Sequence, residues 1–126
     1  MKIPEKQNTV MPYLIVNNAA DFMAFMKKVF GAEELHVMRR QEDPSKIQHA
    51  QVDIGGSVIM FADTVDLYPV QNAGLFIYVP DTDSTYKVAM ESGCKSAMEP
   101  TKTSYSEKAA GILDPFGNTW WLAMPA

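Results

Sequence analysis

Apolar and polar residues follow two different spacings along this chain. In residues 19–30 and 81–92, apolar side chains recur every three or four positions, which is the spacing of one helical face. In residues 47–54 they alternate one by one, as on a half-buried strand. Gly31 and Gly93 follow the two helical segments, where glycine commonly ends a helix. The pattern therefore predicts two short helices and at least one strand.

The remaining apolar segments are short and predict further strands. They cover residues 10–16, 35–41, 57–62, 74–79, 95–98, 109–113 and 119–124. Pro12 cannot donate to a strand ladder, so the first strand is expected at a sheet edge or bent there. Asn17 and Asn18 offer turn and cap chemistry before the first helix. Residues 63–72 have little periodicity and are expected to connect two halves.

The order strand, helix and three strands occurs twice. Residues 53–56 and 114–117 both read Asp-x-x-Gly, and an apolar strand follows each of them. A repeat of this length is too long for a solenoid unit and indicates one pseudo-symmetric domain. We predict an α+β fold of two pseudo-symmetric βαβββ modules. The expected boundaries are a flexible N-terminus at 1–9, one domain at 10–126, and modules at about 10–63 and 73–124.

Composition narrows the functional classes. The chain has 126 residues, a formal net charge of -4 and one cysteine, Cys94. A single cysteine excludes an internal disulfide and a cysteine-only metal cluster. Because acidic residues outnumber basic ones, the chain as a whole lacks the positive charge that binding to nucleic acid or an anionic membrane requires. No apolar run approaches 18 residues and the N-terminus lacks a leader's apolar segment, so we expect a cytoplasmic protein without a membrane segment.

Several short stretches resemble one known superfamily in their order and spacing. They are residues 12–19, 29–33, 49–50, 55–60, 105–109 and 114–121. Together they resemble the vicinal oxygen chelate superfamily, which includes the glyoxalase, bleomycin resistance and extradiol dioxygenase families. Residues 55–60 and 114–121 look most like its PhnB-like branch, and residues 105–109 sit where that branch usually has Trp-Gly-Asp/Glu-Arg-x. The resemblance implies that the two βαβββ modules form a curved mixed sheet with a concave ligand cup.

In metal-bearing members of this superfamily, four His, Glu or Gln side chains of the cup bind a divalent ion. By the resemblance these positions fall on Met11, Met60, Gly74 and Trp121 in this chain. A thioether suits only soft metals, and glycine and tryptophan supply no ligand. We therefore expect neither a metal at the superfamily position nor another cofactor.

The resemblance and strand alternation together place a set of side chains in the cup. The expected ligand-binding residues are Met11, Tyr13, His49, Gln51, Met60, Phe76, Tyr78, Tyr105 and Trp121. Most are aromatic or thioether side chains, which line pockets for flat or apolar small molecules. His49 is also the one catalytic candidate, since a histidine with a pKa near neutral can act as a base.

Three functional hypotheses follow. The first is a metal-free protein that binds a small aromatic or apolar molecule, in the manner the bleomycin resistance likeness implies. The alternative is a lyase, isomerase or dioxygenase of the same superfamily, using a relocated metal or His49 as base. The third is an interaction module without a ligand. The resemblance also implies a homodimer, whereas neither nucleic acid nor a membrane is an expected partner.

Overall fold

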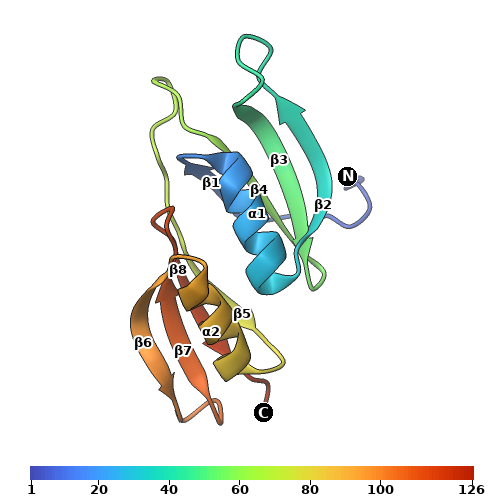
Figure 1. The fold of residues 1–126 in the computed structure, drawn as a ribbon. Coiled ribbons are helices and arrows are strands. Elements are labelled where there is room, and N and C mark those ends of the chain that lie inside the picture. The colour runs from blue at the N-terminus through green and yellow to red at the C-terminus, as the bar shows by residue number, and fades with distance from the viewer. The chain divides into compact units, whose positions relative to one another are not determined.

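The computed structural model describes residues 1–126, which divide into two compact units, 1–71 and 72–126, called here the first and second module. Each module contains one strand, one helix and three more strands (Figure 1). The first contains β1 (Tyr13–Val16), α1 (Ala19–Phe30), β2 (Glu33–Arg39), β3 (Ile47–Ile54) and β4 (Ser57–Asp63). The second contains β5 (Gly74–Tyr78), α2 (Thr82–Glu91), β6 (Lys95–Thr101), β7 (Ala109–Leu113) and β8 (Thr119–Ala123). The predicted α+β fold of two βαβββ modules is confirmed.

The sheet of the first module has the order β1-β4-β3-β2, with β1 and β4 parallel and the other pairs antiparallel. The edge strand β1 begins only at Tyr13 because Pro12 has no N–H for the ladder. The Pro12 carbonyl still accepts a hydrogen bond from the Met60 N–H at 3.0 Å. Between β3 and β4, Gly55 and Gly56 both have positive φ and form the predicted two-residue hairpin turn.

One face of this sheet is covered by α1, which packs on β1, β3 and β4. The helix buries the apolar stripe that its spacing predicts, and the Phe22 ring meets Phe61 edge-on with ring centroids 5.2 Å apart. Leu14 and Val16 of β1 are buried on this same face, as strand alternation requires. The opposite face of the sheet carries the alternate residues.

A buried carboxylate joins three elements of the first module. Asp63, at the end of β4, accepts the Ala19 N–H of α1 at 2.9 Å and the Ile47 N–H of β3 at 2.7 Å. Asn18 has left-handed backbone angles and its side chain makes no cap hydrogen bond. Asn18 therefore occupies the predicted N-cap position, but its side chain does not cap the helix. The carboxylate of Asp63 satisfies the first helical N–H group and places negative charge at the helix N-terminus.

The second module repeats this topology, with sheet order β5-β8-β7-β6 and a parallel pair β5 and β8. Helix α2 packs on β6, β7 and β8, and Trp120, Ile112 and Leu122 are fully buried. β6 extends to Thr101 instead of ending near Met98, with two irregularities in its pairing to β7 that accommodate Pro100. Neither helix of the chain is long and apolar enough to cross a lipid bilayer.

Asp114 organises the turn between β7 and β8. Its Oδ1 accepts the N–H groups of Phe116 at 2.8 Å and Asn118 at 2.9 Å. Its Oδ2 accepts from Asn118 Nδ2 at 3.2 Å and from the indole Nε1 of Trp120 at 2.9 Å. Burial, and secondarily this carboxylate, raise the pKa of the neighbouring Cys94 to about 12, so the thiol stays protonated at neutral pH.

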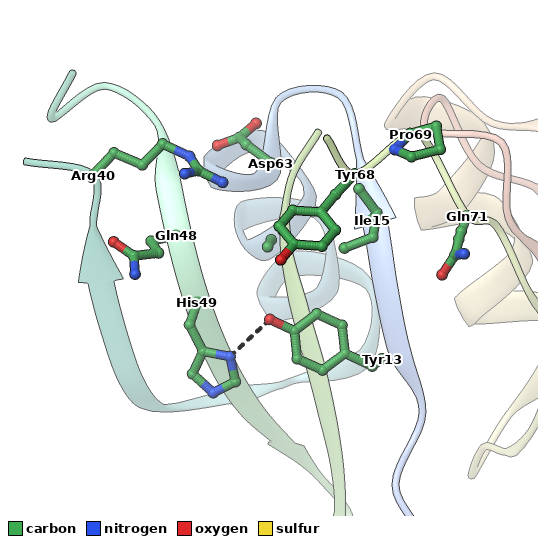
Figure 2. Close-up of a pocket in the computed structure, with 10 residues that line it drawn as sticks. Tyr13, Ile15, Arg40, Gln48, His49, Asp63, Tyr68, Pro69 and Gln71 are labelled. Carbon is green, nitrogen blue, oxygen red and sulfur yellow. Dashed lines mark hydrogen bonds between the residues drawn. The ribbon is translucent and has the colours of Figure 1, made fainter. Parts of the chain in front are cut away.

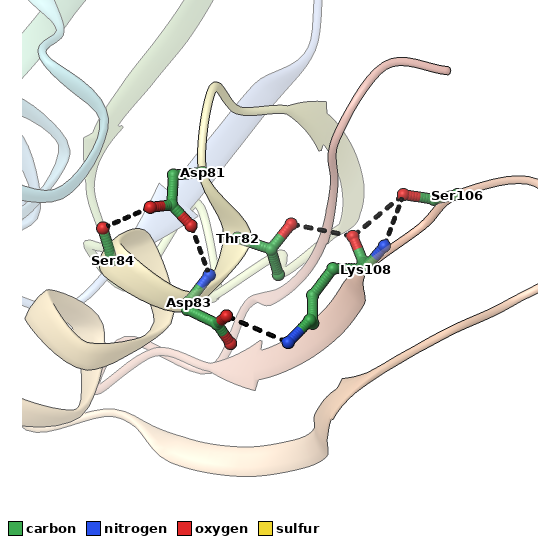
Figure 3. Close-up of polar contacts among 6 residues, drawn as sticks. All are labelled: Asp81, Thr82, Asp83, Ser84, Ser106 and Lys108. Atoms are coloured by element: carbon green, nitrogen blue, oxygen red, sulfur yellow. Dashed lines mark hydrogen bonds and ion pairs between the residues drawn. The ribbon is translucent and has the colours of Figure 1, made fainter.

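Hydroxyl groups connect the start of α2 to the segment before β7, in the place where the first module uses the Asp63 carboxylate (Figure 3). Thr82 Oγ1 donates to the Lys108 carbonyl at 2.8 Å, and Lys108 Nζ pairs with Asp83 at 3.0 Å. Ser106 Oγ lies 2.9 Å from the carbonyls of both Lys108 and Met124. Asp81 caps the helix by accepting the Asp83 N–H at 3.1 Å. The two modules thus tie the same elements together with different side chains.

Candidate functional site

A cavity of about 570 Å³ opens on the face of the first module's sheet that α1 leaves uncovered (Figure 2). The strand register places Tyr13 opposite Met60 and Ile15 opposite Ala62, so all four side chains share this face. Residues from β1, β3 and β4, the hairpin after β2 and the connector after β4 line it. They are Tyr13, Ile15, Arg40, Gln48, His49, Ala62, Asp63, Tyr68, Pro69 and Gln71. The walls therefore combine apolar and aromatic side chains with an equal number of polar or charged ones.

The connector after β4 is held against this cavity by backbone hydrogen bonds. The Ile15 N–H donates to the Gln71 carbonyl at 3.1 Å, and the Gln71 N–H donates to the Ile15 carbonyl at 2.9 Å. Val65 and Tyr68 close a small loop with a matching pair of bonds. The Val65 N–H donates to the Tyr68 carbonyl at 3.2 Å, and the Tyr68 N–H donates to the Val65 carbonyl at 2.9 Å. Tyr68 and Pro69 thereby form one wall of the cavity, although nothing in the periodicity of residues 63–72 predicts a role for them.

A β-bulge brings two consecutive residues of β3 into the same cavity. Met38 of β2 pairs with His49 and Arg39 pairs with Ile47, so Gln48 is the extra residue on β3. Consecutive side chains of a regular strand point to opposite faces, and a bulge changes that direction locally. This is why Gln48 and His49 both line the cavity, together with Arg40 just beyond the end of β2.

His49 forms hydrogen bonds through both of its ring nitrogens. Nδ1 lies 3.0 Å from the Tyr13 hydroxyl, and Nε2 lies 2.9 Å from Gln51 Nε2. Gln7 Nε2 donates to Gln51 Oε1 at 3.0 Å, which orients the Gln51 amide so that its NH₂ group faces the histidine. Because an amide NH₂ group only donates, His49 Nε2 must accept. Its proton is therefore on Nδ1, and the ring donates to the Tyr13 oxygen.

The ionisation of these two rings agrees with that arrangement. Burial, and secondarily the nearby His36, lower the pKa of His49, which keeps the imidazole neutral at pH 7. A proton on Nε2 would face the donor group of Gln51. Burial raises the pKa of Tyr13 although Arg40 acts in the opposite direction, so Tyr13 keeps its phenolic proton. Since the Tyr13 oxygen accepts from His49, its own proton is free to bond a molecule in the cavity.

The uncovered face of the second module carries a cluster of exposed aromatic rings. The Phe76 ring lies edge-on to Tyr78 with centroids 5.1 Å apart, and the Tyr105 ring is 6.2 Å from Phe76. Phe76 pairs with Trp121 in the register of β5 and β8. About half of Phe76 and 40% of Trp121 remain exposed. The predicted aromatic residues of this module therefore share one face.

The side chain of Trp121 lies directly over Gly111 of the neighbouring strand β7. A Cβ atom built on Gly111 would lie 2.6 Å from Cζ3 and 2.8 Å from Cε3 of the indole. Only glycine leaves room for the ring at this distance. Gly111 therefore fixes how the indole of Trp121 sits on the sheet.

Replacing Gly111 by alanine is expected to push the Trp121 indole towards solvent and to destabilise the protein by about 1 kcal/mol. Tryptophan emission should shift to longer wavelength and become more accessible to acrylamide, while buried Trp120 stays protected. Gly74→Ala is the matched control, since nothing lies within 4 Å of a Cβ atom at that position. An unchanged spectrum in Gly111→Ala would contradict the packing described here.

The structure brings some of the predicted site residues together. Tyr13, His49 and Gln51 form one hydrogen-bonded chain, and Met60 pairs with both Tyr13 and Gln51. Met11 precedes β1, is half-buried and does not line the cavity. Sequence analysis missed Arg40, Gln48, Asp63, Tyr68, Pro69 and Gln71 as cavity residues.

The arrangement of elements and motifs can now be compared with known proteins. The family model described as "Glyoxalase/Bleomycin resistance protein/Dioxygenase superfamily" matches residues 6–122. The chain belongs to this superfamily. An uncharacterized protein of Mycobacterium bovis, Mb0911c, is 27% identical over 125 residues, covering 90% of this chain and 81% of that protein. The uncharacterized protein Rv0887c of Mycobacterium tuberculosis is also 27% identical, covering 90% of this chain and 72% of the relative.

Solved structures of the superfamily share the fold at low sequence identity. PA1353 of Pseudomonas aeruginosa superposes with a TM-score of 0.75 at 19% identity, covering 94% of this chain and 98% of that one. The PhnB protein of Bacillus cereus superposes with a TM-score of 0.74 at 17% identity, covering 93% of this chain and 99% of that one. A third structure is the fosfomycin resistance protein FosX of Listeria monocytogenes in a complex with Mn(II) and sulfate. It superposes with a TM-score of 0.68 at 15% identity, covering 94% of this chain and 93% of that one.

The metal positions of the superfamily do not fit a divalent ion in this member. The resemblance assigns them to Met11 and Met60 in the first module and to Gly74 and Trp121 in the second. The register agrees with that pairing, since Met60 lies opposite Tyr13 as Trp121 lies opposite Phe76. None of the four side chains is an oxygen or imidazole ligand. Elsewhere too, the structure places no group of three or more His, Cys, Asp or Glu side chains to hold a metal ion.

Proposed function

We propose that this superfamily member binds a small aromatic or apolar molecule in the cavity of its first module, without a metal at the superfamily position. The observation that carries the proposal is the cavity itself. Its volume of about 570 Å³ lies in the range of small-molecule sites, which are mostly apolar with a few placed polar groups. Ile15, Ala62 and Pro69 supply aliphatic surface, and Tyr13 and Tyr68 supply rings for a flat molecule.

The hydrogen bonds around His49 favour binding over catalysis. A general base needs a free lone pair within reach of the substrate proton. In this cavity the Nε2 lone pair accepts a hydrogen bond from the Gln51 amide. The Nδ1–H group donates a hydrogen bond to the Tyr13 oxygen. His49 therefore holds the Tyr13 hydroxyl in place as a donor. A lyase, isomerase or dioxygenase function with His49 as base remains the alternative, and it requires the Gln51 contact to open.

We further propose membership of the PhnB-like branch. The motif at residues 114–121 supports it, because its Asp114 and Asn118 build the turn before the last strand, and residues 105–109 occupy the matching loop. The predicted homodimer, the cytoplasmic location and the ligand-binding roles of Met11, Met60 and the second module's aromatic residues stay predictions.

Removal of the Tyr68 ring gives a direct test of the binding proposal. Tyr68→Ala is expected to weaken binding of the neutral probe 2-naphthamide about tenfold, because one aromatic wall of the cavity is lost. The measurement is isothermal titration of the full chain with this probe.

The matched control is Leu67→Ala, which truncates the adjacent residue of the same connector. Leu67 is 76% exposed and does not line the cavity, so this variant should bind 2-naphthamide as the unaltered chain does. Failure of the unaltered chain to bind the probe, or equal losses in the two variants, would count against the proposed site.

A further inference from the structure

Arg40 has an unusual environment for a guanidinium group. Its side chain is only 17% exposed, and its Nε atom is buried without a hydrogen-bond partner. The one ion pair, between Arg40 Nη1 and Glu42 Oε1, has a length of 3.8 Å, which is too long for a hydrogen bond, and Glu42 is 71% exposed. A largely desolvated cation with so few partners is unfavourable in the free protein. It has donors available for a group that enters the cavity.

No other lining residue neutralises this charge by direct contact. Asp63 is the only carboxylate among the ten, and each of its oxygens already accepts a backbone N–H group, from Ala19 and Ile47. No ion pair within 4.0 Å forms between Asp63 and Arg40. His49 is neutral, so it adds neither a competing cation nor a counter-charge. Arg40 is therefore the one cationic side chain lining the cavity.

A second donor faces the same part of the cavity. In Figure 2 the Tyr13 hydroxyl points towards β3, with His49 below Arg40 on that side. Arg40 is close enough to Tyr13 for its positive charge to lower the pKa of the phenol, against the larger effect of burial. The Tyr13 proton is not used within the protein, because His49 donates to its oxygen. An anionic oxygen near Arg40 would meet a cation and a hydroxyl donor together.

We propose that the cavity selects aromatic molecules that carry a carboxylate, held by Arg40 and Tyr13 while the ring packs between Tyr68 and the aliphatic wall. This inference rests on the proposed function and adds the chemical class of the ligand. The planar guanidinium suits a carboxylate, since both groups can form two parallel hydrogen bonds. Arg40 lies two residues after Met38, which pairs with His49, so alternation along this segment directs Arg40 to the same face as His49.

Two probes of the same shape test the inference: 2-naphthoate, which carries the carboxylate, and 2-naphthamide, which is neutral. The unaltered chain should bind 2-naphthoate at least about tenfold more tightly. Arg40→Gln should weaken 2-naphthoate binding by about ten- to hundredfold and leave 2-naphthamide within about twofold. Arg40→Lys should restore part of the naphthoate affinity by returning the charge.

The matched control is Arg39→Gln, which removes the same charge one residue earlier. Arg39 is exposed and donates to the Pro44 carbonyl at 3.2 Å outside the cavity, so both affinities should stay unchanged. Equal affinity of the two probes, with no effect of Arg40→Gln, overturns the inference and leaves the proposed function standing. Binding of neither probe at millimolar concentration overturns both. The comparison of probes on the unaltered chain gives this answer even if a variant fails to fold.

Discussion

Asp114→Asn is expected to lower the free energy of unfolding by about 3 kcal/mol. Four donors converge on the Asp114 carboxylate, which is only 3% exposed. An amide keeps one acceptor oxygen for the backbone N–H groups, but its NH₂ group then faces the Asn118 amide and the Trp120 indole. Each buried donor left without an acceptor costs about 1–3 kcal/mol. Urea unfolding followed by tryptophan emission measures the change, and Trp120 reports on the site itself.

The internal repeat supplies a control for this substitution. Asp53 occupies the corresponding Asp-x-x-Gly position, but its Oδ1 accepts only the Gly56 N–H, at 2.7 Å in an exposed turn. Asp53→Asn should therefore cost no more than about 1 kcal/mol. Similar losses in Asp53→Asn and Asp114→Asn would show that the charge at the turn matters, and not the buried hydrogen bonds.

Asp63→Asn should destabilise the first module by about 3 kcal/mol. Its two carboxylate oxygens accept one buried N–H each, from α1 and from β3. The NH₂ group of asparagine would face one of these backbone N–H groups, which then has no acceptor. The substitution also removes the negative charge at the helix N-terminus, which contributes up to about 1 kcal/mol. Denaturant unfolding gives the free energy, and hydrogen exchange at the Ala19 and Ile47 amides shows whether the loss begins there.

Asp21→Asn separates the two contributions. Asp21 lies in the first turn of the same helix, is exposed and has no buried hydrogen bond. Its loss removes a similar charge near the same helix end, so we expect a change of no more than about 0.5 kcal/mol. A loss comparable to that of Asp63→Asn would assign the effect to the helix dipole and contradict the role given to the buried acceptor.

Local patterns were sufficient to predict much of the fold. The spacing of apolar residues and the following Gly31 define α1 at Ala19–Phe30, and alternation defines β3 at Ile47–Ile54, in both cases with the bounds observed. These signals depend only on neighbours along the chain. The repeated Asp-x-x-Gly turns likewise predicted the two modules, because each turn is built by its own residues.

The candidate site was less predictable because long-range pairing positions its side chains. A single extra residue on β3 turns Gln48 to the cavity, and no propensity marks where such a bulge occurs. Tyr68 and Pro69 reach the cavity because the connector pairs with β1 through Gln71. The side-chain acceptor at the start of α1 was not predicted for the same reason, since Asp63 lies 44 residues beyond Ala19, whose N–H group it accepts.

The contact between Trp121 and Gly111 links the side-chain sizes that these two positions can hold together. The two residues pair across β7 and β8, and a Cβ atom at position 111 would meet the indole ring. A side chain at position 111 therefore fits only beside a residue smaller than tryptophan at position 121. The paired positions of the first module hold Gln51 and Met60, which fit side by side. The two modules therefore fill matching positions of the sheet differently, with a very small and a very large side chain in one and two side chains of similar size in the other.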